Sequence, residues 1–141
     1  MKKNKNIYIT KIFTFAAAHK YGNAKWSDEK NLEVFGKDVR VHGHNYTLHV
    51  TVTGDVNPDT GFLVDLGHLK AIVKKHIVSV LDHSQFEKDV PWFKDKQPST
   101  ENLVVFIWDT ISAHLEGCSL HHIRIVETPT IYTDYYGGNS E

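Results

Sequence analysis

Two histidines separated by one glycine are the residues of this chain whose types and spacing best suit metal chemistry. His42 and His44 lie in the segment 41–46 and lead into an alternating run that is typical of a β-strand. Side chains two residues apart on a strand point to the same face, so both imidazoles can converge on one ion. A catalytic zinc ion takes three protein ligands and keeps a fourth position for water or substrate. We expect His19 to supply the third ligand.

Chance is the alternative explanation of this spacing. The chain holds 10 histidines, so some of them fall two residues apart without any function. Most histidines in proteins bind no metal, and spacing alone therefore leaves both interpretations open.

Length and composition predict one globular domain over residues 1–141. Hydrophobic residues make up 40% and charged residues 23%, which is ordinary for a soluble protein. The net charge of -1 offers no basic surplus for nucleic acid. Cys118 is the single cysteine, which excludes an internal disulfide and fits a reducing compartment. No apolar run approaches transmembrane length, so we expect a cytoplasmic protein that binds neither nucleic acid nor membrane.

Hydrophobic alternation predicts two strands in the first part of the chain. The first strand covers 7–19, with a bulge near Lys11-Ile12 where the alternation breaks. The second covers 45–53. Residues 20–40 between them are polar and mixed, which predicts a long loop, and loops of this length in compact domains are usually functional or disordered. Because this loop connects His19 to the paired histidines, we expect it to be functional.

Apolar residues at steps of three and four predict two helices in the second part of the chain. The first covers 66–81, with Asp65 as its N-cap. A loop over 84–98 precedes the second helix, which Ser99 or Thr100 caps and Gly117 closes. Two strands over 120–127 and 131–136 complete the order ββααββ, an α+β fold.

Six short motifs then occur together and in order, and with them the whole chain resembles the 6-pyruvoyl-tetrahydropterin synthase / 6-carboxytetrahydropterin synthase family. The resemblance implies the tunnelling (T-) fold, in which ββααββ subunits carry two helices on one face of an antiparallel sheet. In that fold the sheets of a trimer close into a barrel, and two trimers usually form a homohexamer. The motifs are FAAAH (15–19), NLEVFGK (31–37), HGHNY (42–46), LDH (81–83), STEN (99–102) and VET (126–128).

The resemblance also implies roles for particular residues. It assigns zinc to His19, His42 and His44, where the ion would polarise the side chain of a pterin triphosphate substrate. Glu127 would anchor the pterin ring, because a carboxylate can accept two parallel hydrogen bonds from a guanidine-like edge.

Four further residues match the family's site. Thr100 and Glu101 would line the substrate pocket, although a helix cap and a first-turn acid explain them equally well. Asp82 and His83 match an acid–base pair in which a carboxylate orients an imidazole. A helix-ending Asp beside a solvated His is the alternative interpretation.

Asp38 is the main departure from the family pattern. Most members carry a catalytic cysteine there, whose thiolate moves protons on the substrate side chain. Reference pKa values are about 3.9 for Asp and 8.5 for Cys, so a carboxylate is a weaker base unless burial raises its pKa. One branch of the family uses Glu at this place and forms 6-hydroxymethyl-dihydropterin. Asp38 could instead reach the metal and close its fourth position.

Three functional hypotheses follow. The first is a zinc-dependent lyase that converts 7,8-dihydroneopterin triphosphate to 6-carboxy- or 6-pyruvoyl-tetrahydropterin, on a route to deazapurines such as queuosine or to tetrahydrobiopterin. The second is carboxylate-based cleavage to 6-hydroxymethyl-dihydropterin for folate synthesis. The third is a pterin-binding paralogue that has lost its base.

Overall fold

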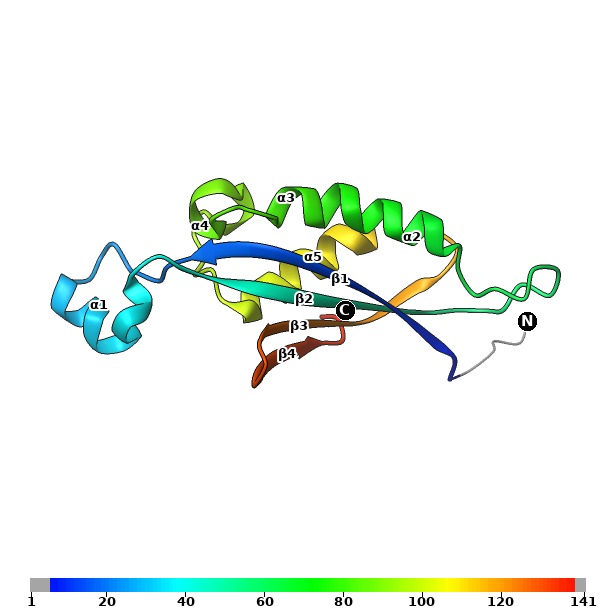
Figure 1. The fold of residues 1–141 in the computed structure, drawn as a ribbon, viewed down its shortest axis with the longest axis horizontal. Helices are drawn as coiled ribbons and strands as arrows, with labels where there is room; N and C mark the ends of the chain where they lie inside the picture. The colour runs from blue at the N-terminus through cyan, green and yellow to red at the C-terminus, as the bar shows by residue number, and fades with distance from the viewer. Residues whose placement is uncertain (1–5, 139–141) are drawn as a thin grey trace.

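The computed structural model describes residues 6–138, and its centre is a four-stranded sheet (Figure 1). The strand order is β1-β2-β3-β4, and every neighbouring pair is antiparallel. This confirms the predicted α+β class and the predicted number of strands. The strands are β1 (Tyr8–His19), β2 (His42–Thr53), β3 (Ser119–Thr128) and β4 (Ile131–Tyr135).

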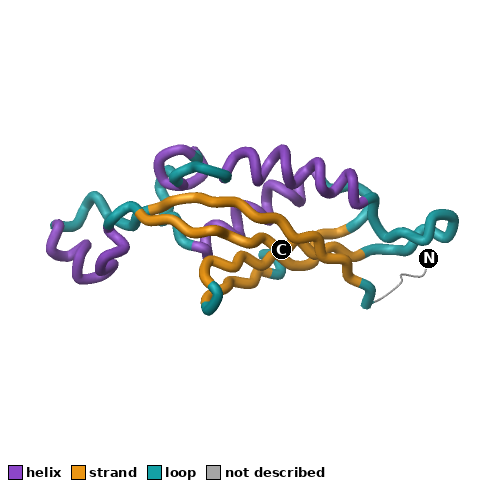
Figure 2. The backbone as a smooth tube through the Cα atoms, in the orientation of Figure 1, coloured by secondary structure: helices purple, strands orange, loops and turns teal. Residues whose placement is uncertain are grey.

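Helices cover one face of this sheet, as Figures 1 and 2 show. The predicted helix over 66–81 is one continuous helical run with a π-type turn in its middle, and it packs with α5 over the buried face. The predicted loop over 84–98 contains two further short helical pieces. The helical elements are α1 (Asp28–Phe35), η1 (Gly36–Val39), α2 (Leu66–Val73), η2 (Lys74–Val78), α3 (Ser79–Leu81), α4 (Phe86–Asp89), η3 (Pro91–Phe93) and α5 (Thr100–His114).

The pairing of β1 with β2 runs without interruption from Tyr8 opposite Thr53 to His19 opposite His42. The predicted bulge near Lys11-Ile12 is therefore wrong. Ile12 breaks the sequence alternation because it is an apolar residue on the uncovered face, where it is 53% exposed. Register shifts lie instead between β2 and β3, at Thr51/Val52, and between β3 and β4, at Val126/Thr128.

Alternate side chains of β1 and β2 face the helix layer and form part of the core. Phe13 and Phe15 of β1 and Tyr46 and Leu48 of β2 are buried under the helix layer. These positions alternate along each strand, so every second residue faces the helices. His19 and His44 continue the same alternation and therefore lie on the helix-covered side at the end of the sheet.

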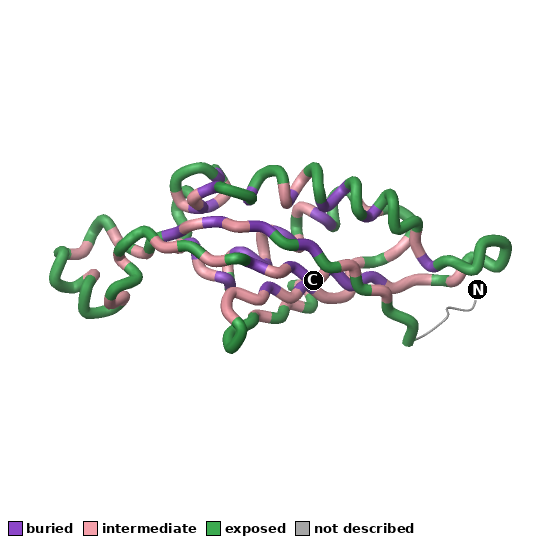
Figure 3. The backbone as a smooth tube through the Cα atoms, viewed as in Figure 1, coloured by how far each residue is buried: buried purple, intermediate pink, exposed green. Residues whose placement is uncertain are grey.

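The segment 20–40, predicted to be a long loop, contains the helix α1 and the turn η1. Ser27 caps α1 by accepting a hydrogen bond from the Lys30 N–H, 3.1 Å away. No residue of α1 is buried, and its apolar Leu32 and Val34 are more than half exposed. Without a buried face the helix leaves no hydrophobic period in the sequence. Figure 1 shows it beyond the end of the sheet, and Figure 3 shows its lack of buried residues.

N-cap residues mark where α2 and α5 begin. Asp65 caps α2 through the N–H groups of Gly67 and His68, as predicted. Of the two candidates for α5, Ser99 is the N-cap, and it accepts from the Asn102 N–H. That helix ends at His114, before the predicted Gly117.

Within residues 6–138 no helix has both the length and the apolar character needed to cross a membrane.

Gly43 yields a stability prediction, because a Cβ atom there would lie 2.9 Å from the backbone carbonyl oxygen of Ala17. We expect Gly43→Ala to lower the free energy of unfolding by about 1–3 kcal/mol, the usual cost of overpacking. Urea unfolding measures this value. Gly22→Ala is the matched control, since nothing lies within 4 Å of its added Cβ. Equal stability of the two variants would contradict the close contact.

Candidate metal centre

Three histidines converge at one end of the β1–β2 pair. His19 is the last residue of β1 and lies opposite His42, the first residue of β2, while His44 follows two positions later on the same face. One ligand nitrogen from each ring lies within 4.8 Å of the other two. The structure thus brings together the three residues that the sequence analysis singled out for zinc.

Backbone carbonyl groups orient two of these rings. Nδ1 of His19 lies 2.7 Å from the carbonyl oxygen of Pro98, and Nδ1 of His42 lies 2.8 Å from that of Arg40. A carbonyl oxygen only accepts hydrogen bonds, so each Nδ1 carries a proton and donates it. In the neutral imidazole Nε2 then keeps a free lone pair, which is the state of a metal ligand. Burial lowers the pKa of His19 below its usual value and so favours this neutral form.

Glu127 brings a carboxylate against the same nitrogens. Its Oε2 atom lies 3.0 Å from Nε2 of His44 and 3.8 Å from Nε2 of His19. Both Nε2 atoms are buried, and neither has a hydrogen-bond partner among the described residues. With its Nδ1 proton on the Pro98 carbonyl, neutral His19 turns its Nε2 lone pair toward this carboxylate, and the two repel each other unless a cation lies between them. The donor set therefore fits a bound cation, and three imidazoles in a compact group suit zinc.

Asp38 borders this cluster on its exposed side. It lies in η1, and its Oδ1 atom is 3.7 Å from Nε2 of His42. The Asp38 side chain is 60% exposed. The compact group of candidate ligand atoms contains the three histidines and not this carboxylate. Asp38 therefore lies beside the three histidines and outside their compact group.

Tyr21 is a site residue that the sequence analysis missed. Its ring centroid lies 5.1 Å from that of His19, and its backbone N–H donates to the Asp38 carbonyl oxygen at 2.9 Å. Burial raises the pKa of Tyr21 to about 12, helped by the charges of Glu127 and Glu101. Its hydroxyl consequently stays protonated and can donate a hydrogen bond. The sequence shows only an aromatic residue two positions after a histidine, which is a weak signal.

Tyr46 adds a second hydroxyl next to the cluster. It is fully buried, and its hydroxyl oxygen has no hydrogen-bond partner among residues 6–138. Burial and then the charge of Glu127 raise the pKa of this phenol. In the sequence Tyr46 is visible only as the end of the HGHNY motif, because its burial depends on the packed sheet.

Thr100 and Glu101 begin α5, as predicted. Thr100 is buried, and its Oγ1 lies 2.8 Å from that of Thr133 on β4. Thr100 is the first helical residue, and Ser99 is the cap. The hydrogen bond between the two threonine hydroxyls ties the helix to β4. Glu101 is exposed, and its charge reaches the Tyr21 hydroxyl from the helix side.

Asp82 and His83 form the predicted carboxylate–imidazole pair, with 3.0 Å between Oδ2 and Nδ1. The other oxygen, Oδ1 of Asp82, accepts a hydrogen bond from the Ala16 N–H at 2.9 Å. His83 has a φ of 63°, in the left-handed region, and its side chain is 84% exposed. No hydrogen bond or ion pair of the described chain joins this pair to the three histidines. The pair is tied instead to the backbone of β1 at Ala16, through Oδ1 of Asp82 and the His83 N–H.

A cavity of about 380 Å³ is the feature that both groups share. Its lining includes His44 from the metal cluster and His83 from the acid–base pair. The remaining lining residues are Ala16, Ala17, Ala18, Gly43, Asn45 and Ser84. Small side chains on both strands therefore leave room for a ligand between the two groups.

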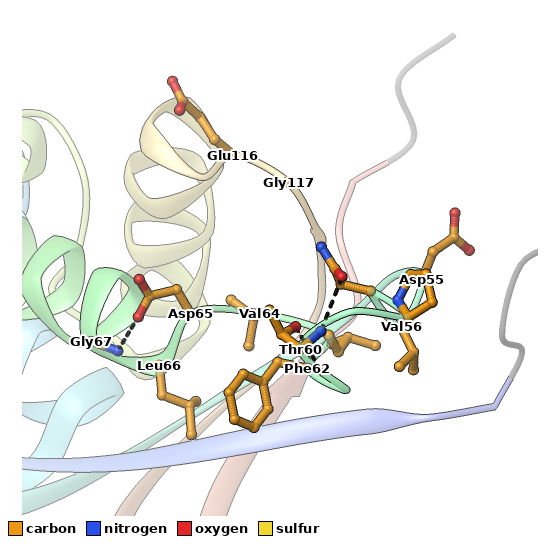
Figure 4. Close-up of a pocket in the computed structure, with 13 residues that line it drawn as sticks. Asp55, Val56, Thr60, Phe62, Val64, Asp65, Leu66, Gly67, Glu116 and Gly117 are labelled. Carbon is orange, nitrogen blue, oxygen red and sulfur yellow. Dashed lines mark hydrogen bonds between the residues drawn. The ribbon is translucent and has the colours of Figure 1, made fainter.

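A larger cavity of about 1030 Å³ lies at the opposite end of the sheet, around the connection from β2 to α2. Figure 4 shows its residues, including the exposed Phe62 and the hydrogen bond from the Gly67 N–H to Asp65. Histidine and cysteine are absent from the residues that line it. Its size alone does not make it the site of metal chemistry.

Comparison with known proteins places the chain in a family. The family model described as 6-pyruvoyl tetrahydropterin synthase matches residues 8–138. The 6-pyruvoyl tetrahydrobiopterin synthase of Poecilia reticulata is 42% identical over 132 residues, which cover 92% of this chain and 90% of that relative. The 6-carboxy-5,6,7,8-tetrahydropterin synthase of Bacillus subtilis is 36% identical over 109 residues, 73% of each chain.

A solved structure agrees with these relatives. The 6-pyruvoyl tetrahydropterin synthase of Caenorhabditis elegans superposes with a TM-score of 0.87 at 31% identity, covering 94% of this chain and 96% of that one. The antiparallel sheet with its helices on one face is a T-fold subunit. The chain belongs to the 6-pyruvoyl tetrahydropterin synthase family.

The geometry of the three histidines predicts how the protein responds to losing one of them. His19→Ala removes a fully buried ligand nitrogen, so we expect the zinc bound per chain after dialysis to fall close to zero. Zinc at about 100-fold its Kd should stabilise the wild type by about 2.7 kcal/mol and leave this variant unchanged. Metal analysis and thermal unfolding measure both effects.

His49→Ala is the matched control for that experiment. His49 lies on β2 as well, but at an alternate position that faces away from the cluster. This variant should keep its zinc. Equal zinc loss in both variants, or a wild type that binds none, would contradict the assignment.

Asp82 predicts a dependence of stability on acid pH. The Ala16 N–H and then His83 hold the pKa of its carboxyl below the usual value. A depressed pKa in the folded state stabilises the fold above the unfolded pKa, and this stabilisation is lost as the pH falls through the folded value. The wild type should therefore be more stable than Asp82→Asn in urea at about pH 6, and the difference should shrink at about pH 3. If the difference in stability between the two proteins were the same at both pH values, the ionised Asp82 carboxylate would not stabilise the fold.

Proposed function

We propose that this protein is a zinc-dependent pterin synthase of the lyase type, acting on 7,8-dihydroneopterin triphosphate. Its product would be a 6-substituted tetrahydropterin, either the 6-pyruvoyl or the 6-carboxy compound. The observation that carries the proposal is the convergence of three imidazole nitrogens and the Glu127 carboxylate at the end of the sheet. The names of the relatives support the substrate class, since they are pterin synthases of both kinds.

In this proposal His19, His42 and His44 hold the zinc ion. When bound, zinc would polarise the hydroxyl and carbonyl oxygens of the substrate side chain and make proton removal easier near neutral pH. The protein prepares the ligands in advance, because the Pro98 and Arg40 carbonyls keep two Nε2 lone pairs directed into the cluster.

Glu127 anchors the pterin ring in the same proposal. Its carboxylate can accept two parallel hydrogen bonds from the amino and N–H groups of the ring. It lies beside His44 and is largely buried, so the ring would be held next to the metal with little competition from water. Thr100 and Glu101, at the start of α5, would line the same pocket.

Asp38 serves as the base in the leading proposal. Its carboxylate lies next to His42 and stays accessible, so it can approach a substrate side chain bound beside the metal. Asp82 and His83 would form the acid–base pair, with the Asp82 carboxylate orienting the imidazole. We further propose a cytoplasmic homohexamer of two trimers, because β1 and β4 are the outer strands of the sheet and their edges gain from pairing with other copies, apart from Ala16–Ala18, which the segment 82–85 already covers.

One observation favours a second candidate function. A carboxylate occupies the place of the usual cysteine, and a carboxylate base fits cleavage of the side chain to 6-hydroxymethyl-dihydropterin. A third candidate, a pterin-binding paralogue without activity, rests on the same substitution, because the reference pKa makes a carboxylate a weaker base than a cysteine thiolate.

Product analysis tests the three candidates together. Zinc-loaded wild type, Asp38→Ala and Asp38→Cys are incubated without oxygen with 7,8-dihydroneopterin triphosphate, and the products are resolved by mass. We expect turnover by the wild type and a loss of about 10²- to 10⁴-fold in Asp38→Ala, the usual contribution of a general base. The mass of the product identifies the branch.

The outcomes separate the candidates. An inert wild type with active Asp38→Cys would mean that the pocket has lost its base, and the enzyme proposal would fail. Unchanged activity in Asp38→Ala would assign proton transfer to another group. Zinc content and pterin binding of each variant serve as controls for an intact site.

A further inference from the structure

The ring of His19 is oriented by a carbonyl group that belongs to neither a helix nor a strand. Nδ1 of His19 lies 2.7 Å from the Pro98 carbonyl oxygen, in a buried hydrogen bond. Pro98 itself lies in the connection between η3 and α5, which contains no helix or strand. The direction of the His19 ligand nitrogen therefore depends on the groups that hold this connection in place.

Asn102 fixes the connection from the side of the helix. It lies in the first turn of α5, and its Nδ2 group donates a hydrogen bond to the Gln97 carbonyl oxygen at 2.8 Å. Ser99, the residue that follows Pro98, is the N-cap of the same helix. Both chain neighbours of Pro98 are thus bound to the first turn of α5. This bond gives a role to the asparagine of the STEN motif.

Gln97 joins the connection to the backbone that follows His19. Its Nε2 group donates to the Gly22 carbonyl oxygen at 2.7 Å, and its Oε1 atom accepts from the Gly22 N–H at 3.3 Å. The two bonds fix the orientation of the amide, because a carbonyl oxygen only accepts and an N–H only donates. The segment that leaves β1 after His19 is therefore held against the connection that orients the His19 ring.

We propose that Gln97 and Asn102 are positioning residues of the metal centre, which hold the Pro98 carbonyl where it directs Nε2 of His19 at the ion. This inference rests on the zinc site of the proposed function. A half-turn of a histidine ring about its Cβ–Cγ bond puts carbon atoms where the nitrogens were. The carbonyl selects one orientation and one tautomer of the ring, and such partners of a metal ligand typically change metal affinity by about 10- to 100-fold.

The exposure of these hydrogen bonds separates positioning from folding. The two bonds between Gln97 and Gly22 lie at the surface, where water competes for their partners, so their loss should cost the fold little. The hydrogen bond that they support is buried, and so is His19. A change at Gln97 or Asn102 should consequently appear in metal binding more than in stability.

The experiment measures zinc affinity and ligand geometry in two variants of the full chain. Asn102→Ala removes the donor to Gln97 and leaves the backbone N–H that Ser99 caps. Gln97→Met keeps the length of the side chain, adds no charge and lacks the amide. We expect each variant to raise the zinc Kd by about 10- to 100-fold, measured by competition with a chelator. The visible spectrum of bound Co²⁺, which reports ligand geometry, should change in both.

Asn57→Ala is the matched control. The Asn57 side chain also binds backbone groups, since its Oδ1 atom accepts from the Asp59 N–H at 2.8 Å and from the Thr60 N–H at 3.2 Å. It lies beside the larger cavity, at the opposite end of the sheet. This variant should keep the zinc Kd and the Co²⁺ spectrum of the wild type.

The outcomes distinguish this inference from the proposed function. A wild type that binds no zinc would remove the metal centre, and both would fail. If the wild type binds zinc and both variants bind it equally tightly, with an unchanged Co²⁺ spectrum, the inference is overturned while the proposed function stands. The inference is overturned as well if Asn57→Ala weakens zinc binding as much as the other two, because the loss would then follow from lower stability alone.

Discussion

The antiparallel register of β1 and β2 is the constraint on which the metal cluster depends. Each strand has 12 residues, and their pairing ends with His19 opposite His42. Side chains alternate between the faces of a sheet, so a shift of one residue would turn one histidine away from the other two. Gly43 lets the strands approach closely at this point, since its hydrogen lies where a Cβ would meet the Ala17 carbonyl. The cluster is thus a consequence of strand pairing rather than of a flexible loop.

Segments far apart in the sequence complete what the two strands begin. The Pro98 carbonyl, just before α5, orients His19, and the Arg40 carbonyl, just before β2, orients His42. Glu127 arrives from β3. The surroundings of the candidate ligand nitrogens therefore come from three separate segments of the chain, which only the folded structure brings together.

The two ends of the sheet differ in how many of their polar groups have hydrogen-bond partners. At the histidine end, buried lone pairs, a carboxylate and two phenols with raised pKa values lie close together without enough hydrogen-bond partners. Such an arrangement is costly in a buried place unless a ligand satisfies it. At the other end, apolar residues such as the exposed Phe62 and Leu66 line part of the larger cavity, and its Asp65 is already engaged as a helix cap. The unsatisfied polar groups therefore indicate the candidate site at the histidine end, although the cavity at the other end is larger.

The sequence by itself determined the four strands, the two main helices and the histidine set, because alternation, three-to-four periodicity and short motifs are local signals. The antiparallel arrangement of the strands followed only from the resemblance to a known family. It could not show α1, which has no buried face, or the unbroken β1–β2 register, which Ile12 disguises. Tyr21 and the exposed place of Asp38 also became visible only in the fold. Only the tertiary structure decided these, since burial, hydrogen-bond partners and the distance between distant residues depend on packing that no local pattern records.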